Sequence, residues 1–580
     1  MRERLLTQHF LQRFLENDLL SPEADRHDAI AMVCGVLLSF GLFLSVIVSM
    51  QFVFMPFQSP ARTAMLAMGD RLLFVTISMI VMALVAVLTW DALSLDPRDT
   101  AIFGPLPIKR GVIVRAKLRA VGMLAGGFAL AISSLSSVVH PSLMVAKLSI
   151  DMIQPLALIV IHLAVTLAAG LFAFASVVVV REVLRAVLGI RFTRVSAGLQ
   201  AVMIIALITS FLLLPALLDR SRPDQRQTAW LPPLWFVGLH EMLAGDLVAN
   251  LPRGSLPANV ARQEDDAAAR YRQIAPVLRP LAWRAVIGLI AALALAIAAF
   301  FWNSRELPLP LVGSRSGRQR GTGLLTHAIT STLARRPAAQ AGFFFTIQCV
   351  FRSGPHRVVM AGCTAVGIAL ATVFLAAGSR STISDLASVP NYVFSTQTMA
   401  LAVLLAGFRH VTRLPADIRA NRLFRLAWVT DGGQFLAGVR RAALAAIVLP
   451  AILALLPPYF FLLGPRLTLM HALSGFLLGA AVISLMMLKP SRLPFVAGYA
   501  PDADLNTKGP IILIGGLIAV SVFSQIERSA LADMKSTLIL WGMLAAIAVL
   551  PHLAVRRNEQ PELPGAFDVP AAGATRLDLG

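Results

Sequence analysis

The sequence predicts an all-α, polytopic membrane protein with about twelve transmembrane helices arranged as two six-helix halves. Three observations lead to this fold class: the composition, the spacing of the charged residues and the uneven distribution of lysine and arginine. Hydrophobic residues make up 57% of the 580 residues and charged residues only 14%, whereas about a quarter of an average soluble domain is charged. A chain of this composition belongs in a lipid bilayer.

Twelve windows contain no Asp, Glu, Lys or Arg and are long enough to cross a membrane. A hydrocarbon core of roughly 30 Å requires about 20 apolar helical residues, because lipid cannot satisfy backbone hydrogen-bonding groups. We predict one transmembrane helix in each window: 29–61, 72–90, 120–146, 152–180, 195–218, 285–304, 358–379, 386–408, 442–465, 467–488, 509–526 and 536–555.

The basic residues predict the orientation of these helices. With the N-terminus inside, inner segments hold 35 Lys and Arg and outer segments hold 16, of which 9 lie in the long segment 219–284. Loops longer than about 60 residues cross the membrane largely regardless of charge, so the short loops carry the signal. Both termini are therefore expected in the cytoplasm. The formal charge of +20 reflects this bias, so we expect a lipid partner and no nucleic acid.

The ends of the chain predict further elements. Residues 1–28 are charged throughout and lack an apolar signal-peptide core, so the first membrane helix is expected to act as an uncleaved targeting signal. Within them, apolar residues recur on one side of an interfacial helix. A comparable stretch returns at 341–357, and His356 precedes Cys363 by the same spacing that separates His27 from Cys34. These similarities predict an internal repeat.

The predicted domain organisation follows from these boundaries. It comprises an interfacial helix (1–28), a first six-helix half (29–302) with an extracytoplasmic segment (219–284), a cytoplasmic linker with a second interfacial helix (303–357), a second six-helix half (358–555) and a cytoplasmic tail (556–580).

Motifs for chemistry are absent from the sequence. It contains no HExxH, GxSxG or GxxxxGK[ST] pattern, and its three cysteines show no CxxC spacing. We predict no catalytic, cofactor-binding or metal site. His162 and His471 lie in apolar windows and are interpreted as hydrogen-bonded to neighbouring helices. Because no window holds a charged residue, energy for uphill transport must come from another molecule.

Several loops resemble those of a known family. The loop WDALSLDPRDTAIFGPLPIKRGVIVRAKL (90–118) is similar to the first cytoplasmic loop of bacterial permease subunits of the ABC-2 exporter type. Further segments fit a two-half branch of those permeases: RFLENDLLSPEADRHD (13–28), LPPLWFVGLHEML (231–243), FRSGPHR (351–357) and LPADIRANRLFRL (414–426). The chain departs from that branch at Arg422, where Trp is preferred, and at 492–504, where a Cys-containing motif is preferred; this leaves a specific role for the 488–508 loop in doubt.

The resemblance implies a permease of the exporter type that is energised by a separate ATPase subunit on the inner face of a bacterial cytoplasmic membrane. ATP and Mg²⁺ would bind that partner, not this chain. Closure of the ATPase dimer would push on stiff cytoplasmic loops and repack the helices. The implied coupling residues are Asp96, Arg98, Asp99, Pro105, Pro107, Lys109, Arg110, Pro415, Asp417, Arg419, Arg422 and Arg425.

Two interpretations stay open at this stage. The charged residues of these loops either contact the ATPase or cap and orient the loop itself. The chain could also be an ATP-independent facilitator, a secondary transporter or a membrane enzyme with an unrecognised site.

Overall fold

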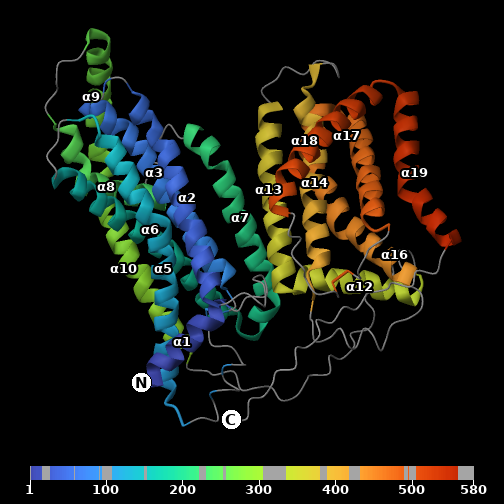
Figure 1. Ribbon diagram of the computed structural model, residues 1–580, viewed down its shortest axis with the longest axis horizontal. Helices are drawn as coiled ribbons and strands as arrows, with labels where there is room; N and C mark the ends of the chain where they lie inside the picture. Colours follow the sequence, from blue (N-terminus) through green and yellow to red (C-terminus); the bar gives the residue numbers. More distant parts are fainter. Residues whose placement is uncertain are drawn as a thin grey trace. The chain divides into compact units, whose positions relative to one another are not determined.

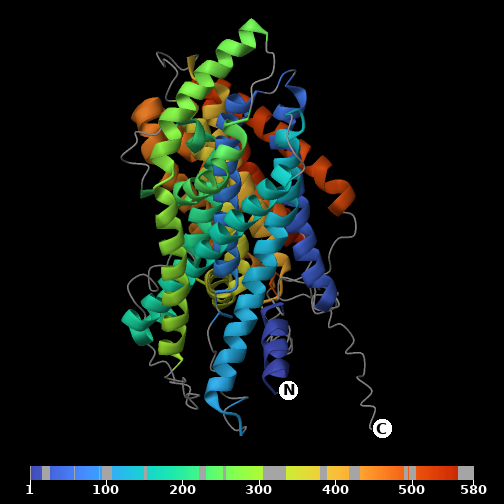
Figure 2. The same cartoon turned by 90° about the vertical axis from the view of Figure 1, so that its left-hand side faces the viewer.

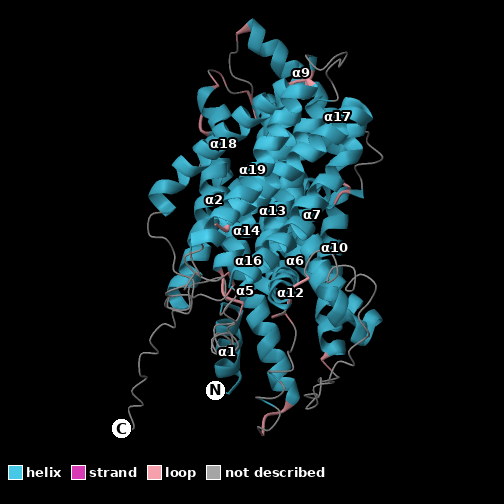
Figure 3. Cartoon of the chain, turned by 90° about the vertical axis from the view of Figure 1, so that its right-hand side faces the viewer, coloured by secondary structure: helices cyan, strands magenta, loops and turns pink. Residues whose placement is uncertain are grey.

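The computed structural model contains helices joined by loops, and among the residues that it describes none forms a strand (Figure 3). The described residues are 2–15, 26–55, 57, 59–90, 92–93, 99, 103, 107–148, 153–220, 230–251, 257–304, 335–378, 388–416, 432–488, 494–495 and 505–558. The predicted cytoplasmic tail 556–580 is therefore described only at residues 556–558. The all-α prediction is confirmed.

The chain divides into two compact units. Unit 1 comprises Met1–Met203 and Leu217–Ser314, and unit 2 comprises Ile204–Ala216 and Arg315–Gly580. The division into two six-helix halves stays a prediction. The unexpected part is the stretch Ile204–Ala216 of α7 (Phe192–Arg220), which belongs to unit 2, whereas the two ends of this helix belong to unit 1.

Unit 1 is a helical bundle built from long apolar helices (Figure 1). Its helices are α1 (Arg2–Leu15), α2 (Arg26–Phe54), α3 (Pro60–Leu88), α5 (Arg110–Val145), α6 (Ile153–Leu188), α8 (Pro232–Ala249), α9 (Ala258–Leu278) and α10 (Leu281–Asn303). The principal pairs are α2 with α5, α3 with α6, and α10 with α6. Figures 1 and 2 place α1 and α9 at opposite ends of this unit.

Helix α8 is an element that the sequence did not predict as part of the bundle. It lies within the segment expected to be extracytoplasmic, but it packs against α3, α6 and α10. Three of its side chains, Phe236, His240 and Glu241, are at most 2% exposed. Its polar residues therefore belong to the interior of unit 1.

Unit 2 repeats the arrangement of a short amphipathic helix followed by long apolar ones. Its helices are α12 (Pro337–Arg352), α13 (Gly354–Gly378), α14 (Asn391–Arg413), α16 (Gly432–Ala443), a π-helical turn (Leu444–Val448), α17 (Leu449–Met486), α18 (Leu505–Ala530) and α19 (Met534–Asn558). Helix α12 lies across the ends of α13 and α14 instead of alongside them (Figure 1). It packs closely on α16.

A sharp kink divides α17 into two helical parts. Gly464 has φ +74° and ψ 168° and is followed by Pro465. Such a positive φ strains residues that carry a Cβ atom, so glycine suits the position. The kink falls at the boundary of the predicted windows 442–465 and 467–488, so each window lies in its own helical part.

The structure confirms a multi-pass membrane protein. Nine helices in the described part of the chain are long and apolar enough to cross a bilayer. One of them, Gly432–Met486, contains the kink and two windows, and a shorter apolar stretch, Met534–Leu550, lies in α19. Each of the twelve windows overlaps a helix, and the number twelve itself stays a prediction.

Candidate functional sites

The first candidate site is the segment before α5, in which the described residues Asp99 and Phe103 are helical and contact the bundle. The Asp99 side chain is 2% exposed and lies 3.8 Å from the Nζ atom of Lys117 on α5, which is equally buried. The same Nζ atom lies 4.6 Å from the centre of the Phe10 ring on α1. One ion pair and one cation–π contact thus join the loop, α5 and α1.

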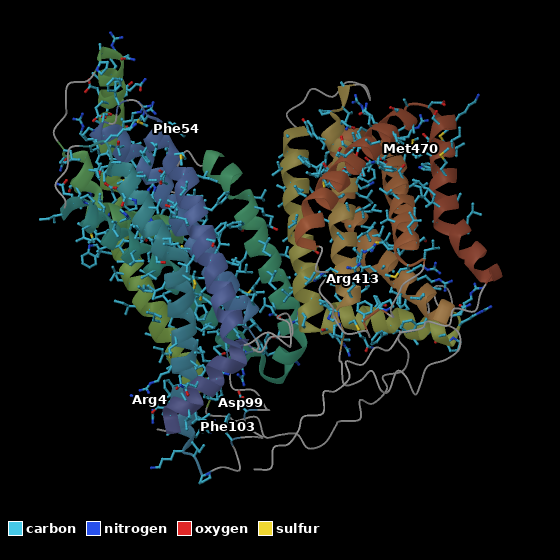
Figure 4. All side chains as sticks on the ribbon, viewed as in Figure 1. Arg4, Phe54, Asp99, Phe103, Arg413 and Met470 are labelled. Atoms are coloured by element: carbon cyan, nitrogen blue, oxygen red, sulfur yellow. The ribbon has the colours of Figure 1, made fainter. Side chains whose placement is uncertain are left out.

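Phe103 provides the second anchor of this loop. Its buried ring makes edge-to-face contacts with His9 at 5.5 Å and with Phe10 at 5.7 Å between ring centres. Figure 4 shows Phe103 and Asp99 at the end of unit 1 where Arg4 of α1 lies. Aromatic pairs of this geometry each add about 0.5–1.5 kcal/mol beyond the burial of apolar area. The loop is therefore held by packing as well as by charge.

The predicted coupling residues have different environments. Asp99 is buried, whereas Pro107, Lys109 and Arg110 are exposed where α5 begins. Pro415 is half-buried after the end of α14. The remaining predicted residues lie outside the described part of the chain: Asp96, Arg98, Pro105, Asp417, Arg419, Arg422 and Arg425.

Unit 2 contains a comparable anchored loop. Phe495 is 1% exposed, and its backbone pairs with Thr412 and Ala416, through N–H···O distances of 2.8 Å in both cases. Its ring packs against Phe345 of α12 and His356 of α13. Phe495 belongs to the stretch where the chain departs from the family that it resembles, and the sequence did not single it out.

The second candidate site is a buried polar cluster in unit 1. Arg71 of α3 and Glu241 of α8 form an ion pair with an N···O distance of 3.1 Å, and their side chains are 2% and 1% exposed. The hydroxyl of Tyr271 donates to the same carboxylate. Tyr271 and Arg279 also line a cavity of about 460 Å³ between α8, α9 and the start of α3. The cluster thus extends from the core to this cavity.

Three buried histidines extend this cluster into the bundle. The His162 ring centre lies 5.6 Å from that of His140 and 5.5 Å from that of His240. The hydroxyl of Ser49 hydrogen-bonds to Nδ1 of His140 at 3.0 Å. The Nε2 atom of His162 has no hydrogen-bond partner among the described residues, so this atom does not make the predicted hydrogen bond to a neighbouring helix. Ring contacts hold it instead.

This cluster places a charged residue inside a membrane helix, which the charge-free windows did not predict. The windows ended at charged residues by definition, but α3 begins at Pro60, twelve positions before its window starts. Arg71 therefore lies inside a 29-residue apolar helix. A buried partner on α8 makes this position tolerable, and that partner could not be identified from α3 alone.

The third candidate site is a buried acid–histidine pair in unit 2. Nδ1 of His471 on α17 lies 2.7 Å from a carboxylate oxygen of Glu527 on α18, and the two side chains are 0% and 1% exposed. The edge of this histidine ring also meets Tyr459 and Phe394. The prediction that His471 bonds to a neighbouring helix is confirmed. Glu527 directly follows its charge-free window and was not predicted.

These three sites are the candidate functional sites among the described residues. In that part of the chain, no group of three or more His, Cys, Asp or Glu residues is arranged to hold a metal ion. No protein-family model matches the chain, and neither a curated protein nor a solved structure matches it. The functional assignment therefore depends on the resemblance of the loops and on the geometry of these three sites.

Proposed function

We propose that this chain is the membrane-spanning permease subunit of an ABC transporter of the exporter type, driven by a separate ATPase subunit. The ATPase binds the exposed parts of the cytoplasmic loops and supplies the energy for transport. The chain itself provides the helix bundle and the pathway for the substrate.

The observation that carries this proposal is the anchored loop of unit 1. A force applied to a loop reaches the membrane helices only if the loop is firmly attached to them. Asp99 and Phe103 attach it to α5 and α1 through buried contacts, while Lys109 and Arg110 remain exposed at the start of α5. This combination of a fixed base and an exposed basic surface suits a loop that transmits displacement.

The burial of Asp99 changes its expected role. A carboxylate that is 2% exposed and paired with Lys117 is better suited to orienting the loop than to contacting another protein. Of the two interpretations of the loop charges, orientation applies to Asp99. Contact with the ATPase is proposed for Lys109 and Arg110.

A secondary transporter is the alternative that a specific observation favours. Ionisable side chains lie in the interior of both units, as the Arg71–Glu241 and His471–Glu527 pairs. Intramembrane ionisable residues often belong to ion pathways. The two proposals differ in whether the isolated chain accumulates a solute when only an ion gradient is supplied.

The experiment is cross-linking in native membranes, followed by affinity purification of the full chain and identification of bound proteins by mass spectrometry. We expect an ABC ATPase in the wild-type sample and a loss of at least tenfold in the K109E/R110E variant. The matched control is R262E/R270E, which reverses two exposed arginines of α9 at the other end of unit 1. Equal ATPase recovery from K109E/R110E and the control would rule out this surface as the contact.

A further inference from the structure

We propose that the His471–Glu527 pair is a proton-binding site that holds one exchangeable proton between α17 and α18. It would give unit 2 a ligand, the proton, that neither the sequence nor the resemblance assigns to it. The proposal does not depend on the identity of the energy source.

The geometry brings two titratable groups together in a dry environment. The Nδ1···Oε1 distance is 2.7 Å, within the range of a hydrogen bond that involves an ionised group. The other polar atoms of the pair, Nε2 of His471 and Oε2 of Glu527, are buried without a partner among the described residues. The two groups therefore depend on each other for their charge balance.

The charge balance requires a proton. A neutral imidazole beside an ionised carboxylate leaves one buried negative charge, and an isolated buried charge is costly. Adding one proton gives either an imidazolium–carboxylate pair or a neutral imidazole with a carboxylic acid. Both forms have zero net charge, so burial of this pair favours the protonated dyad.

The neighbouring groups described below do not supply a positive charge that would balance Glu527 in place of this proton. Helix α14 contributes Gln397, whose amide donates to the His471 carbonyl oxygen, and Phe394. Helix α17 contributes Tyr459, whose hydroxyl donates to the Val393 carbonyl oxygen. Among the described residues, His471 is the basic side chain that pairs with Glu527, and no lysine or arginine does so.

The position of the dyad allows exchange with one side of the membrane. His471 lies six residues after Pro465, where the second part of α17 begins, which corresponds to about 9 Å along a helix. Glu527 lies one turn before the end of α18 at Ala530. Separation of α18 from α17 would open the dyad toward that end.

The test uses the full-length chain in lipid nanodiscs at pH 7, with ¹⁵N-labelled histidine. The two ring nitrogens are spectroscopically alike in an imidazolium and clearly different in a neutral ring. The His471 signals are assigned by their absence from H471Q. His356 is the internal control, because it is also fully buried but bonds to neutral groups, the Ser353 hydroxyl and the Leu414 carbonyl.

We expect an imidazolium at His471 that becomes neutral in E527Q, or a protonated-carboxyl infrared band that E527Q removes. His356 stays neutral in both proteins. If E527Q does not fold, E527D replaces it, and a protonated-carboxyl band from this site then shifts instead of vanishing. A neutral His471 in the wild type, without any carboxyl band that depends on residue 527, would overturn the proposal.

Discussion

The two units neutralise a buried glutamate in different ways. In unit 1, Glu241 is paired with Arg71 and accepts a hydrogen bond from Tyr271. In unit 2, Glu527 is paired with His471. An arginine keeps its charge at any pH that a protein encounters, whereas a histidine can lose its proton near neutrality. The units thus share a buried acid but differ in whether its charge is permanently balanced.

This difference assigns separate roles to the two pairs. The Arg71–Glu241 pair joins α3 to α8 and is fixed by three elements, because Tyr271 comes from α9. The His471–Glu527 pair joins α17 to α18, and a histidine is charged only when it is protonated. We therefore expect unit 1 to be sensitive to the loss of either partner and unit 2 to be tolerant of the loss of its acid.

The largest effect is expected for Glu241→Gln. The substitution leaves the Arg71 charge buried without a carboxylate, and breaking a buried pair in this way costs about 3–5 kcal/mol. The measurement is the thermal unfolding midpoint in detergent. The double variant R71Q/E241Q should recover part of the loss, because it removes both charges. A midpoint unchanged in E241Q would contradict the structural role of the pair.

Phe103→Ala tests the anchor of the loop in unit 1. Removing a buried phenylalanine ring costs about 3–5 kcal/mol in a well-packed core, and a site at the edge of the bundle falls toward the lower limit. Loss of the contacts with His9 and Phe10 should release α1. Hydrogen exchange of residues 3–11 should then accelerate while that of α6 stays unchanged. Equal protection of α1 in both proteins would show that Phe103 is not its anchor.

Gly438→Ala tests the comparable docking of α12 in unit 2. A Cβ atom at Gly438 would lie 2.1 Å from the Ala339 carbonyl oxygen, so α12 and α16 must separate, at a cost of about 1–3 kcal/mol. Gly126→Ala is the control, because nothing lies within 4 Å of its Cβ position. That control should be neutral or slightly stabilising.

Cys349 of α12 reports this separation. Burial raises the pKa of the Cys349 thiol to about 12, so very little reactive thiolate is present at pH 7. In a chain that lacks the other two cysteines, maleimide labelling should be slow in the wild type and faster in G438A. Equal labelling rates would show that the helices stay in contact.

The smallest effect on stability is expected for Glu527→Gln. His471 can become neutral when its acid is removed, so no charge stays buried, and the cost should be about 1 kcal/mol, as for an ordinary hydrogen bond. The comparison with E241Q uses the same substitution at a similarly buried acid. Equal losses in the two variants would contradict the difference between the units.

The sequence predicted the helices well and the polar interior poorly. Apolar windows mark helices because lipid exposure demands long runs without charge, and every window overlaps a helix. The partners of Arg71 and Glu527 come from α8 and α17, far away in the sequence. No periodicity within one helix reveals such a partner. The charge-free windows therefore stopped next to Arg71 and Glu527, the charged residues that form these buried pairs.

The segment before α5 likewise depends on contacts that the sequence does not reveal. Its charged and proline residues were identified from the sequence, but the buried state of Asp99 depends on Lys117 and on the Phe10 ring. Phe103 and Phe495 were not singled out, because one aromatic residue in a loop has no pattern of its own. Their roles come from the amphipathic helices α1 and α12 that pack against them.

The most direct test of the proposed function is reconstitution of the chain in lipid vesicles with and without its ATPase. The chain alone should not hydrolyse ATP. Addition of the ATPase identified by cross-linking should give hydrolysis that K109E/R110E reduces at least tenfold and R262E/R270E leaves unchanged. Accumulation of a solute by the isolated chain under an ion gradient, without any effect of the ATPase, would contradict the account and favour a secondary transporter.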